Sequence, residues 1–487
     1  MRRINYGQIA RVLSWLLIIE AAFMVVPFVT ALVTDGKDIA AFTWSGIITL
    51  AVGLAGTVFI RPSRNNMAKR EGFLLTALVW VVFSIFGMLP FIFSETEPMG
   101  VTDGFFEAMS GFTTTGATVM ESVSDSSHAA LMWRCLMQWI GGMGIILFTL
   151  ALLPMLNSSG GMQMFNAEVT GITHDKIRPR ISQTAVRLWG VYISLSIVLF
   201  LLLILGPMTP FEALCHTFTS ISTGGYSTAS SSIAYWHSYY TETVLTVFMF
   251  LGGVNFGLIY KASMGQPATL WRNDVFRSYL YIILVAYLLF VIAIVAMGQY
   301  HDIASVTIHP IFQIVSTITS TGYTVENFEA WGQFVLALTF MLMFFGGCAG
   351  STSGGAKIDR LLYLFKNSRN ELYRVLHPNE VATVRINERA VPTYIVSKVI
   401  AFLCFYVIII AVGGIALTAC GMPIVDSFFS SFSCLSNIGL GAGITGYGGG
   451  YELVPDFGKW ILSFLMLVGR LELFTVLILF TPTFWRK

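Results

Sequence analysis

One polar stretch, MSGFTTTGATVM at residues 109–120, separates two long apolar runs of the chain. It places Thr113, Thr114 and Thr115 directly before Gly116, in a setting that suits neither a regular helix nor contact with lipid. Glycine lets the backbone turn its carbonyl oxygens inward at little steric cost, and threonine hydroxyls can satisfy nearby backbone groups. Because rings of carbonyl oxygens replace the water around a cation in potassium filters, these residue types suggest cation coordination.

The same interruption occurs four times in the chain. GFFEAMSGFTTTGAT (104–118) recurs as ALCHTFTSISTGGYS (213–227), as PIFQIVSTITSTGYT (310–324) and more loosely as SFFSSFSCLSNIGLG (427–441). The alignment gives one equivalent position to four glycines: Gly116, Gly225, Gly322 and Gly439. A glycine-rich turn between helices is common for any one loop, but four in register indicate an internal repeat.

Each loop follows a segment that can form a short helix. Thirteen residues before the glycines stand Asp103, Glu212, His309 and Asp426, so in three cases an acid can cap a helix whose negative end points at the glycine. A second cluster of small residues follows each glycine at 24 to 30 residues: Gly141, Gly142 and Gly144; Gly252 and Gly253; Gly346, Gly347 and Gly350; and Gly469. The pattern predicts a unit of span, re-entrant pore helix and loop, span, repeated four times around one central pore.

The composition explains what surrounds these loops. The chain has 487 residues, of which 55% are hydrophobic and 11% charged, and its mean hydropathy of +0.74 predicts an all-α polytopic membrane protein. Ten segments are long and apolar enough to span a bilayer: 12–33, 41–60, 73–93, 131–156, 188–206, 241–259, 278–298, 331–345, 393–420 and 460–481. The first resembles a signal peptide, but its apolar run is too long and lacks a small-residue cleavage site. We therefore expect two extra N-terminal spans in residues 1–72, followed by pore repeats at 73–186, 187–277, 278–390 and 391–487.

The basic residues predict the orientation. With both termini in the cytoplasm, 24 of the 28 Lys and Arg residues fall on the inner side, as the positive-inside rule requires. The outer connections are acidic and include Asp103 and Glu107, which would either concentrate cations at an entrance or simply be polar loop residues. Arg134 and Arg470 lie within apolar segments. We expect Arg134 to pack behind the first loop.

A second interruption, GGCAGSTSGG at residues 346–355, is too rich in Gly and Ser to stay helical in mid-membrane. The sequence predicts a break into a flexible loop, and the alternative is a close helix-packing motif of small residues. Arg470 follows Gly469 at the equivalent depth, and a charge there is a functional candidate. Its alternative is a structural ion pair with Glu472, although residues i and i+2 do not face each other on a helix. Glu20, in the first span, is expected to mediate helix contact.

Four stretches resemble one known family: DGFFEAMSGFTTTGATV, QWIGGMGII, FFGGCAGSTSGGAK and GRLELFTVLILFTPTFWR. They are similar to the TrkH family, the membrane subunits of the bacterial Trk potassium uptake system, within a superfamily that includes KtrB and the plant HKT transporters. The resemblance implies a potassium-selective filter lined by the following residues: Thr114, Thr115, Gly116, Thr223, Gly224, Gly225, Ser320, Thr321, Gly322, Asn437, Ile438 and Gly439. In the superfamily, serine at the first glycine position tends to accompany sodium transport, so the resemblance and Gly116 favour potassium.

Within this resemblance, the potassium ligands are the backbone carbonyls of Thr115, Gly224, Thr321 and Ile438. The fourth loop and Gly224 are looser versions of the family pattern. The resemblance also implies a gate below the filter, formed by Gly346, Gly347, Cys348, Ala349, Gly350, Ser351, Thr352, Ser353, Gly354, Gly355 and Arg470. In the family the loop moves, and the arginine acts as a positive barrier.

Partners and cofactors follow mainly from the resemblance. The inner loops are basic and carry no nucleotide motif, so we expect this chain to bind no cofactor and no nucleic acid, with the potassium ion as its substrate. The family implies a homodimer and a separate TrkA-type cytosolic ring of RCK domains that binds ATP/ADP or NADH. It also implies a multi-pass protein of the bacterial inner membrane.

Two transport mechanisms remain open from the sequence. The first is a gated potassium-conducting uptake protein, and the alternative is a secondary symporter that couples potassium or sodium to protons or sodium. The four repeats run in the same sense, whereas inverted repeats are typical of many symporters, which favours a channel-like pore. An enzyme is not expected, because the seven histidines are scattered and the six cysteines lack metal-ligand spacing. His216 and His309 are expected to be hydrogen-bonded helix residues.

Overall fold

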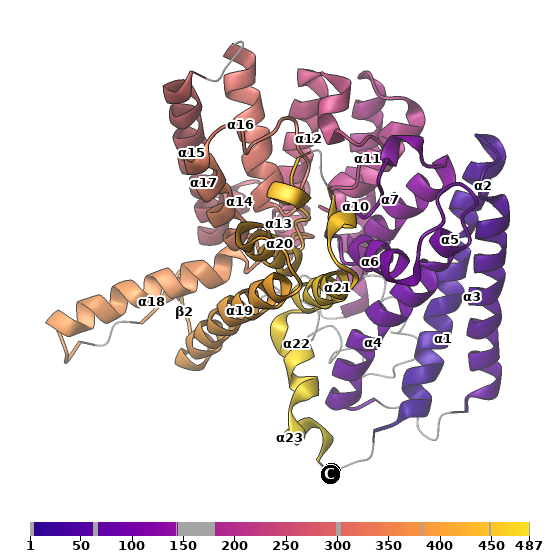
Figure 1. Cartoon of the computed structure of the whole chain (residues 1–487). Coiled ribbons are helices and arrows are strands. Elements are labelled where there is room, and N and C mark those ends of the chain that lie inside the picture. Colours follow the sequence, from indigo (N-terminus) through magenta and orange to yellow (C-terminus); the bar gives the residue numbers. More distant parts are fainter. Residues whose placement is uncertain are drawn as a thin grey trace.

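The computed structural model describes residues 4–61, 67–142, 144, 181–298, 303–380, 383–447 and 450–486. In these ranges the regular structure is helical apart from one two-residue antiparallel pair, β1 (Arg385–Ile386) and β2 (Arg389–Ala390) (Figure 1). Six of the described helices are long and apolar enough to cross a membrane, or eight when each of two bent pairs counts as one span. The predicted all-helical class is confirmed.

The helices that could lie in or beside the membrane follow the chain in order. The first group comprises α1 (Tyr6–Phe23), α2 (Val25–Val33), α3 (Ile39–Phe59), α4 (Lys69–Gly87), α5 (Leu89–Ile92), α7 (His128–Gly142) and α10 (Ile181–Ile204). The second comprises α12 (Tyr239–Gly252), α13 (Phe256–Ser263), α14 (Ala268–Trp271), α15 (Asp274–Met297) and α17 (Gln333–Phe345). The last comprises α18 (Ile358–Leu376), α19 (Thr393–Ala419), α21 (Asp456–Arg470), α22 (Leu473–Leu477) and α23 (Pro482–Trp485).

Four short helices precede the four loops: α6 (Val101–Phe112), α11 (Pro210–Ile221), α16 (Ile303–Ile318) and α20 (Ile424–Ser436). Asp103, Glu212 and Asp426 lie in the first turns of α6, α11 and α20, and not at the cap positions that the sequence predicts. In the first turn their negative charges interact favourably with the positive end of the helix dipole. Thr209 caps α11 and forms a capping box with Glu212. The third helix differs more, because α16 begins at Ile303 and continues through Pro310, so His309 lies inside it.

The four short helices lie in a closed ring of contacts. Each packs against the spans that flank it in the sequence and also against the second span of the preceding unit. The cross-unit pairs are α7 with α11, α12 with α16, α17 with α20, and α21 with α6. The last pair joins the end of the chain to its first loop and closes the ring. We call the side of the ring on which α6, α11 and α20 begin the loop face.

Two predicted spans are not continuous. Residues 241–259 bend by 105° between α12 and α13, and residues 460–481 bend by 114° between α21 and α22. The first bend follows Gly252 and Gly253, and the side chain of Asn255 then caps α13. The second follows Leu471, where Glu472 adopts a positive φ of 57°. The predicted span 131–156 is described only through Gly142 and at Gly144, and residues 157–180 of the predicted inner loop lie outside the described residues.

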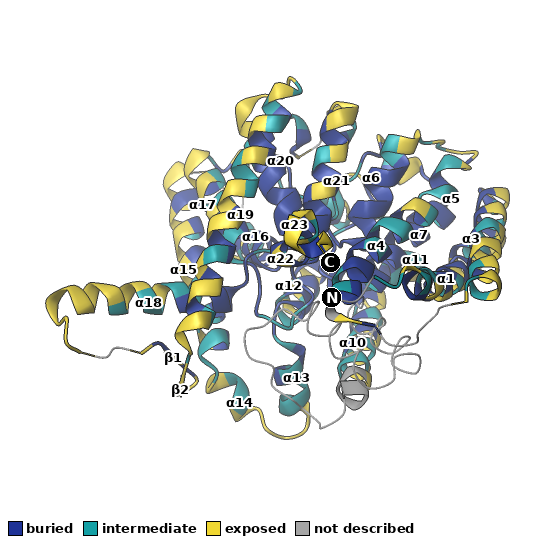
Figure 2. Cartoon of the chain, turned by 90° about the horizontal axis from the view of Figure 1, so that it is seen from below, coloured by how far each residue is buried: buried dark blue, intermediate teal, exposed yellow. Residues whose placement is uncertain are grey.

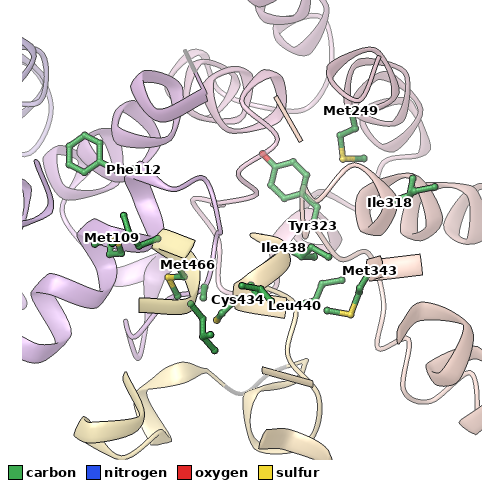
Figure 3. Close-up of a cluster of buried hydrophobic side chains, with 14 of the residues drawn as sticks. Met109, Phe112, Met249, Ile318, Tyr323, Met343, Cys434, Ile438, Leu440 and Met466 are labelled. Carbon is green, nitrogen blue, oxygen red and sulfur yellow. The ribbon is translucent and has the colours of Figure 1, made fainter. Parts of the chain in front are cut away.

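The core surrounds the ring, and the apolar exterior faces outward. Figure 2 shows buried residues gathered on the short helices, with exposed residues on outer spans such as α3, α15 and α19. The core includes Met109, Phe112, Ile438 and Leu440, which lie around the loops (Figure 3). Large exposed apolar side chains on the outer spans are what a lipid-facing surface requires. This distribution buries the polar loops in protein, the condition under which irregular backbone is stable at membrane depth.

Both described ends of the chain contact the start of α4, on the side opposite the loop face. The Arg70 side chain donates to the backbone oxygens of Thr483 and Arg486, each at 3.1 Å. The Asn5 backbone donates to Glu71 at 2.7 Å. The two ends therefore lie on one side of the ring, as an even number of spans requires.

On the loop face, Asp38 joins the N-terminal spans to the first unit. Its carboxylate accepts hydrogen bonds from Ser94 Oγ (2.9 Å), the Glu95 N–H (2.8 Å), Thr96 Oγ1 (2.8 Å) and Ser127 Oγ. Burial disfavours its charged form, but these hydrogen bonds outweigh burial and lower the pKa of Asp38 below its ordinary value. Since an unfolded aspartate titrates near pH ~4, the stabilisation is present above about pH 4 and is lost as the pH falls through the lower folded-state pKa.

We expect Asp38→Ala to destabilise the protein by about 3 kcal/mol, because it leaves several buried donors without an acceptor. The measurement is the thermal unfolding midpoint of detergent-solubilised protein. Glu95→Ala is the matched control, since Glu95 is exposed and contributes only its backbone N–H to the network. Equal unfolding midpoints for the two variants would contradict the role given to Asp38.

Candidate functional site

The four loops share one backbone conformation. Each short helix ends at a residue with left-handed backbone, at Thr114 (φ 55°), Thr223 (φ 53°), Ser320 (φ 57°) and Asn437 (φ 53°). The next N–H bonds back to a helix carbonyl five residues earlier, from Thr115, Gly224, Thr321 and Ile438 at 2.9, 2.8, 2.9 and 3.0 Å. This is the Schellman ending of a helix. The following glycines also have positive φ, of 85° at Gly116, 78° at Gly225, 83° at Gly322 and 79° at Gly439.

The glycines meet one another's loops in cyclic order. A Cβ atom added to Gly116 would lie closer than 3.0 Å to the carbonyl oxygen of Gly224, which precedes the glycine of the second loop. The same overlap holds for Gly225 with Thr321, for Gly322 with Ile438, and for Gly439 with Thr115. The series returns to its start after four contacts. The four glycines that the sequence aligns therefore surround one central point.

Exposure within the loops follows the same pattern. Each of the four glycines is partly exposed, while the residues directly before and after it are buried. The accessible part of every loop is thus the glycine backbone beside a carbonyl oxygen of the neighbouring loop. A site of this kind offers backbone oxygens rather than charged side chains, which suits a desolvated monovalent cation.

The glycines in the middle of the following spans let those spans approach the short helices. A Cβ atom at Gly141 would overlap the carbonyl oxygen of Phe112, and one at Gly469 would overlap that of Leu435. At Gly252 it would meet Thr223 Cγ2 at 2.9 Å. Each position abuts the end of the short helix in its own unit. A larger residue there would push the loop out of the ring.

The threonines of the first and third loops form bonds within their loops. The hydroxyls of Thr113 and Thr115 lie 2.8 Å apart, and those of Thr319 and Thr321 lie 2.7 Å apart. The side chain of Asn437 donates to Thr115 Oγ1 at 3.0 Å and so joins the fourth loop to the first. These hydroxyls are buried and fix the loops from behind, which explains why so polar a stretch interrupts an apolar chain.

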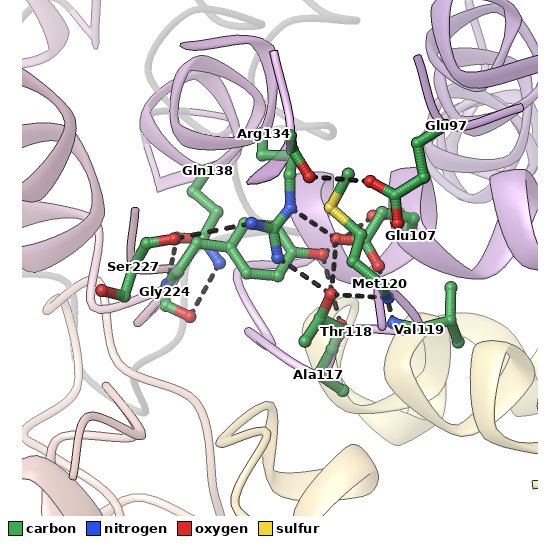
Figure 4. Close-up of polar contacts among 12 residues, drawn as sticks. Glu97, Glu107, Ala117, Thr118, Val119, Met120, Arg134, Gln138, Gly224 and Ser227 are labelled. Carbon is green, nitrogen blue, oxygen red and sulfur yellow. Dashed lines mark hydrogen bonds and ion pairs between the residues drawn. The ribbon is translucent and has the colours of Figure 1, made fainter. Parts of the chain in front are cut away.

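A buried ion pair supports the first loop. Arg134 Nε donates to Glu107 Oε1 at 2.7 Å, and Arg134 Nη2 donates to Thr118 Oγ1 at 2.9 Å (Figure 4). The guanidinium also lies 4.1 Å from the ring centre of Tyr226, in the second loop. Glu107 accepts in addition from the Val119 N–H at 3.0 Å. Arg134 packs behind the first loop, as the sequence predicts.

Glu107 corrects the sequence interpretation. The sequence places it among the acidic outer connections, but it is completely buried in α6. Its partner, Arg134, lies on the next helix, and charged residues are buried where such a partner is available. Asp103, by contrast, stays partly exposed and pairs with Lys459 at 2.6 Å.

Residues 346–357 form an irregular loop below the ring, where α17 ends at Phe345. Its backbone bonds to the break between α12 and α13: the Cys348 N–H donates to the Gly253 oxygen at 2.8 Å, and the Phe256 N–H donates to the Gly350 oxygen at 3.0 Å. The Gly354 N–H donates to Ser320 Oγ, in the third loop, at 2.6 Å. The predicted helix break at 346–355 is therefore present.

Arg470 joins this loop to the first unit. Its Nη1 donates to the Thr352 oxygen at 3.0 Å and its Nη2 donates to the Gly141 oxygen at 2.6 Å. Glu472 pairs instead with Arg360, at 2.5 Å. A cavity lies here, lined among others by Trp80, Gly142, Gly354, Lys357, Tyr406 and Arg470. One guanidinium thus bridges units one, three and four at the floor of the ring.

Some residues at the site were not found from the sequence. The side chain of Asn255 donates to the Ala349 oxygen at 2.5 Å, and its signal in the sequence is a polar residue two positions after the paired glycines 252 and 253. Lys357 donates to the Ser353 oxygen and is buried. Residue spacing does not predict either contact. Asn255 and Ala349 are 94 positions apart in the sequence, and Lys357 and Ser353 both lie in a loop without regular structure.

The remaining candidate groups have simpler environments. His216 lies 2.8 Å from the Glu212 oxygen and 3.1 Å from Ser227 Oγ, so it is a hydrogen-bonded helix residue. His309 contacts two carboxylates instead, with Glu326 at 2.9 Å and Glu242 at 3.4 Å. Glu20 is buried beside Gly87. All six cysteines are free thiols, and Cys404 is exposed. Among the described residues no three His, Cys, Asp or Glu side chains are grouped to hold a metal ion.

Known proteins share this architecture. The family model for TrkH, described as a cation transport protein, matches residues 38–487. The Trk system potassium uptake protein TrkH of Escherichia coli strain K12 is 38% identical over 489 residues, covering 99% of this chain and 100% of that protein. The protein of the same name from Vibrio parahaemolyticus is 36% identical, with 99% and 100% covered. The crystal structure of the potassium transporter TrkH from Vibrio parahaemolyticus matches with a TM-score of 0.90 at 34% identity, over 99% of this chain and 100% of that one.

We expect Arg134→Ala to destabilise the fold by about 3–5 kcal/mol, because it leaves Glu107 buried and unpaired. The measurements are the yield of folded protein and its thermal unfolding midpoint. Replacing Arg134 and Glu107 together should cost less than the sum of the two single changes. Arg374→Ala is the control, since its pair with Glu371 at 2.6 Å is exposed and such pairs contribute about 0–1 kcal/mol. A mild Arg134→Ala effect, equal to the control, would contradict this account.

Proposed function

Since the chain belongs to the TrkH family of cation transport proteins, we propose that it carries potassium across the membrane through the ring of four loops. The observation that supports this most is the cyclic contact of Gly116, Gly225, Gly322 and Gly439 with the carbonyl oxygens of the next loop. The relatives named above are potassium uptake proteins and potassium transporters. The protein is a multi-pass membrane protein, and the ring is the part of it suited to ions.

In this proposal the oxygens of Thr115, Gly224, Thr321 and Ile438 replace the water around a potassium ion. Potassium is weakly hydrated, and neutral carbonyl dipoles hold it firmly enough to dehydrate it but loosely enough to release it. The backbone positions are fixed by the Schellman endings and by the buried hydroxyls behind the loops. The loops therefore resist contraction around a smaller ion such as sodium.

The gate in this proposal is the loop at 346–355 together with Arg470. The positive charge of Arg470 lies below the ring and opposes the passage of a cation. The loop is held by hydrogen bonds to the α12–α13 break, to the third filter loop and to Arg470 itself. Moving the loop would carry the arginine's partner Thr352 away and open the path.

The remaining proposals concern the orientation of the protein in the membrane, its regulatory partner and its oligomeric state. The side opposite the loop face carries both described chain ends and α18, which ends among basic residues, and the positive-inside rule assigns this side to the cytoplasm of a bacterial inner membrane. A cytosolic ring of nucleotide-binding RCK domains, carrying ATP/ADP or NADH, would dock there and control the loop. The protein would act as a homodimer with one pore in each chain.

The experiment that tests the proposal is flux into proteoliposomes for potassium, rubidium, sodium and lithium. Uptake should follow the membrane potential and favour potassium and rubidium. Measurement with and without an imposed proton gradient separates a conducting pore from a symporter, because only the symporter accumulates potassium against its electrochemical gradient. Absence of potassium flux in any condition would overturn the proposal.

We expect Gly116→Ser to reduce the potassium-to-sodium flux ratio by about tenfold or more, equivalent to ~1.4 kcal/mol of discrimination. A side chain at φ 85° is strained and overlaps the Gly224 oxygen, so the ring must deform. Gly190→Ser is the control, because a Cβ atom at Gly190 meets nothing within 4 Å. An unchanged ratio in Gly116→Ser would remove the filter assignment.

We expect Arg470→Ala to raise potassium flux several-fold in the absence of any regulatory subunit. The change removes the charge and frees the Thr352 and Gly141 oxygens that the guanidinium holds. Arg470→Lys keeps the charge but not the two-armed bridge, so its flux should lie between those of Ala and the native protein. If Arg470→Ala conducts no faster than the native chain, the gate assignment fails.

A further inference from the structure

The second loop differs from the others at the residue before its glycine. That residue is Thr115 in the first loop, Thr321 in the third and Ile438 in the fourth, but Gly224 in the second. Thr115 and Thr321 each bond to a second threonine in the same loop. Gly224 and Ile438 have no hydroxyl with which to do so, and of the four residues Gly224 alone has no side chain at all.

Gln138, on α7, supports the second loop. Its Nε2 donates to the Gly224 oxygen at 2.7 Å, and its Oε1 accepts from the Tyr226 N–H at 3.1 Å (Figure 4). The two bonds lie on either side of Gly225. A Cβ atom at Gly224 would lie closer than 3.0 Å to the Gln138 carboxamide, so the amide occupies the space that a side chain takes up in the other loops.

The equivalent positions on the other spans are methionines. Gln138 stands three residues before the mid-span glycine Gly141, and Met249, Met343 and Met466 stand three residues before Gly252, Gly346 and Gly469. All four side chains are 0% exposed. Figure 3 shows the three methionines among the buried side chains around the loops. Packing at this position therefore does not require an amide.

The ring order pairs each of these residues with the next loop. It matches Gln138 with Gly224, Met249 with Thr321, Met343 with Ile438, and Met466 with Thr115. A methionine accompanies a loop residue that has a side chain, and the glutamine accompanies the glycine. Gln138 bonds to the Gly224 oxygen, and the other three pairs follow from the order of the helices in the ring and the alignment of the spans.

From this we infer that Gln138 is a positioning residue that sets the ion selectivity of the second loop, an inference that rests on the proposed function. A carbonyl oxygen has two lone pairs, and Gln138 takes one at Gly224 while the other stays available to an ion. The bond fixes the Gly224 oxygen at the distance that suits potassium. Without it, no side chain at position 224 helps to hold this carbonyl in place, and the second loop can close around a smaller ion.

The first test is Gln138→Met, which copies the residue of the other three spans. We expect the potassium-to-sodium flux ratio in proteoliposomes to fall about fivefold, because the Gly224 oxygen is released. Met343→Leu is the matched control and should leave the ratio unchanged. A Gln138→Met protein that is folded by size-exclusion profile and retains the native ratio would overturn the inference.

The second test uses the complementary pairing. Gly224→Thr alone should abolish most potassium flux, because the new side chain overlaps Gln138. The double change Gln138→Met with Gly224→Thr copies the pairs Met249 with Thr321 and Met466 with Thr115, so it should recover flux and part of the selectivity. A double variant with no more flux than Gly224→Thr would contradict the pairing. If Gln138→Met alone fails to fold, this comparison of the double variant with Gly224→Thr is the test of the inference.

The Gly116→Ser measurement separates this inference from the proposed function. If Gly116→Ser lowers the flux ratio and Gln138→Met does not, only the role of Gln138 is wrong. If neither changes the ratio, the four loops are not the filter.

Discussion

The structure depends on one contact made four times, in which a glycine lies against the carbonyl oxygen that precedes the glycine of the next loop. Any Cβ atom at these positions would overlap that oxygen, and positive φ values add a second reason for glycine. The contact runs between units and never within one. No single unit can therefore form the site, and the spans, short helices and mid-span glycines are arranged so that all four contacts are made together.

This arrangement carries a conformational cost that the surrounding protein offsets. Thr114, Thr223 and Ser320 adopt a left-handed backbone that costs an L-residue roughly 1–2 kcal/mol each. The cost is tolerated because each such residue lies in a Schellman ending that satisfies the helix carbonyls. In the first two of these units the following span also packs closely through its glycines. Below the ring, Arg470 bridges the loop at 346–357 to α7, and further hydrogen bonds join that loop to the α12–α13 break and to the third loop.

The repeat made the loops and their glycines predictable, because the need for glycine is a local steric one that recurs at fixed spacing. Hydropathy could not show the bends after Gly253 and Leu471, since it averages over a window and does not sense direction. The burial of Glu107 depends on its ion pair with an arginine 27 residues later, a tertiary contact that local sequence does not predict. The sequence does not reveal the role of Gln138 for the same reason, because that role depends on a hydrogen bond to Gly224, on another unit. The equivalence of Gln138 with three methionines can be seen only when the spans are aligned on their glycines.

The joint between Asn437 and Thr115 spans 322 positions of the chain, and Gly439 closes the ring against the same residue. During synthesis the first three loops leave the ribosome and enter the bilayer well before the fourth. Until the fourth arrives, the other three have no partner to complete the circle. A chain that ends before α20 therefore holds an open arc of three loops, because the contacts of Asn437 and Gly439 with Thr115 cannot form.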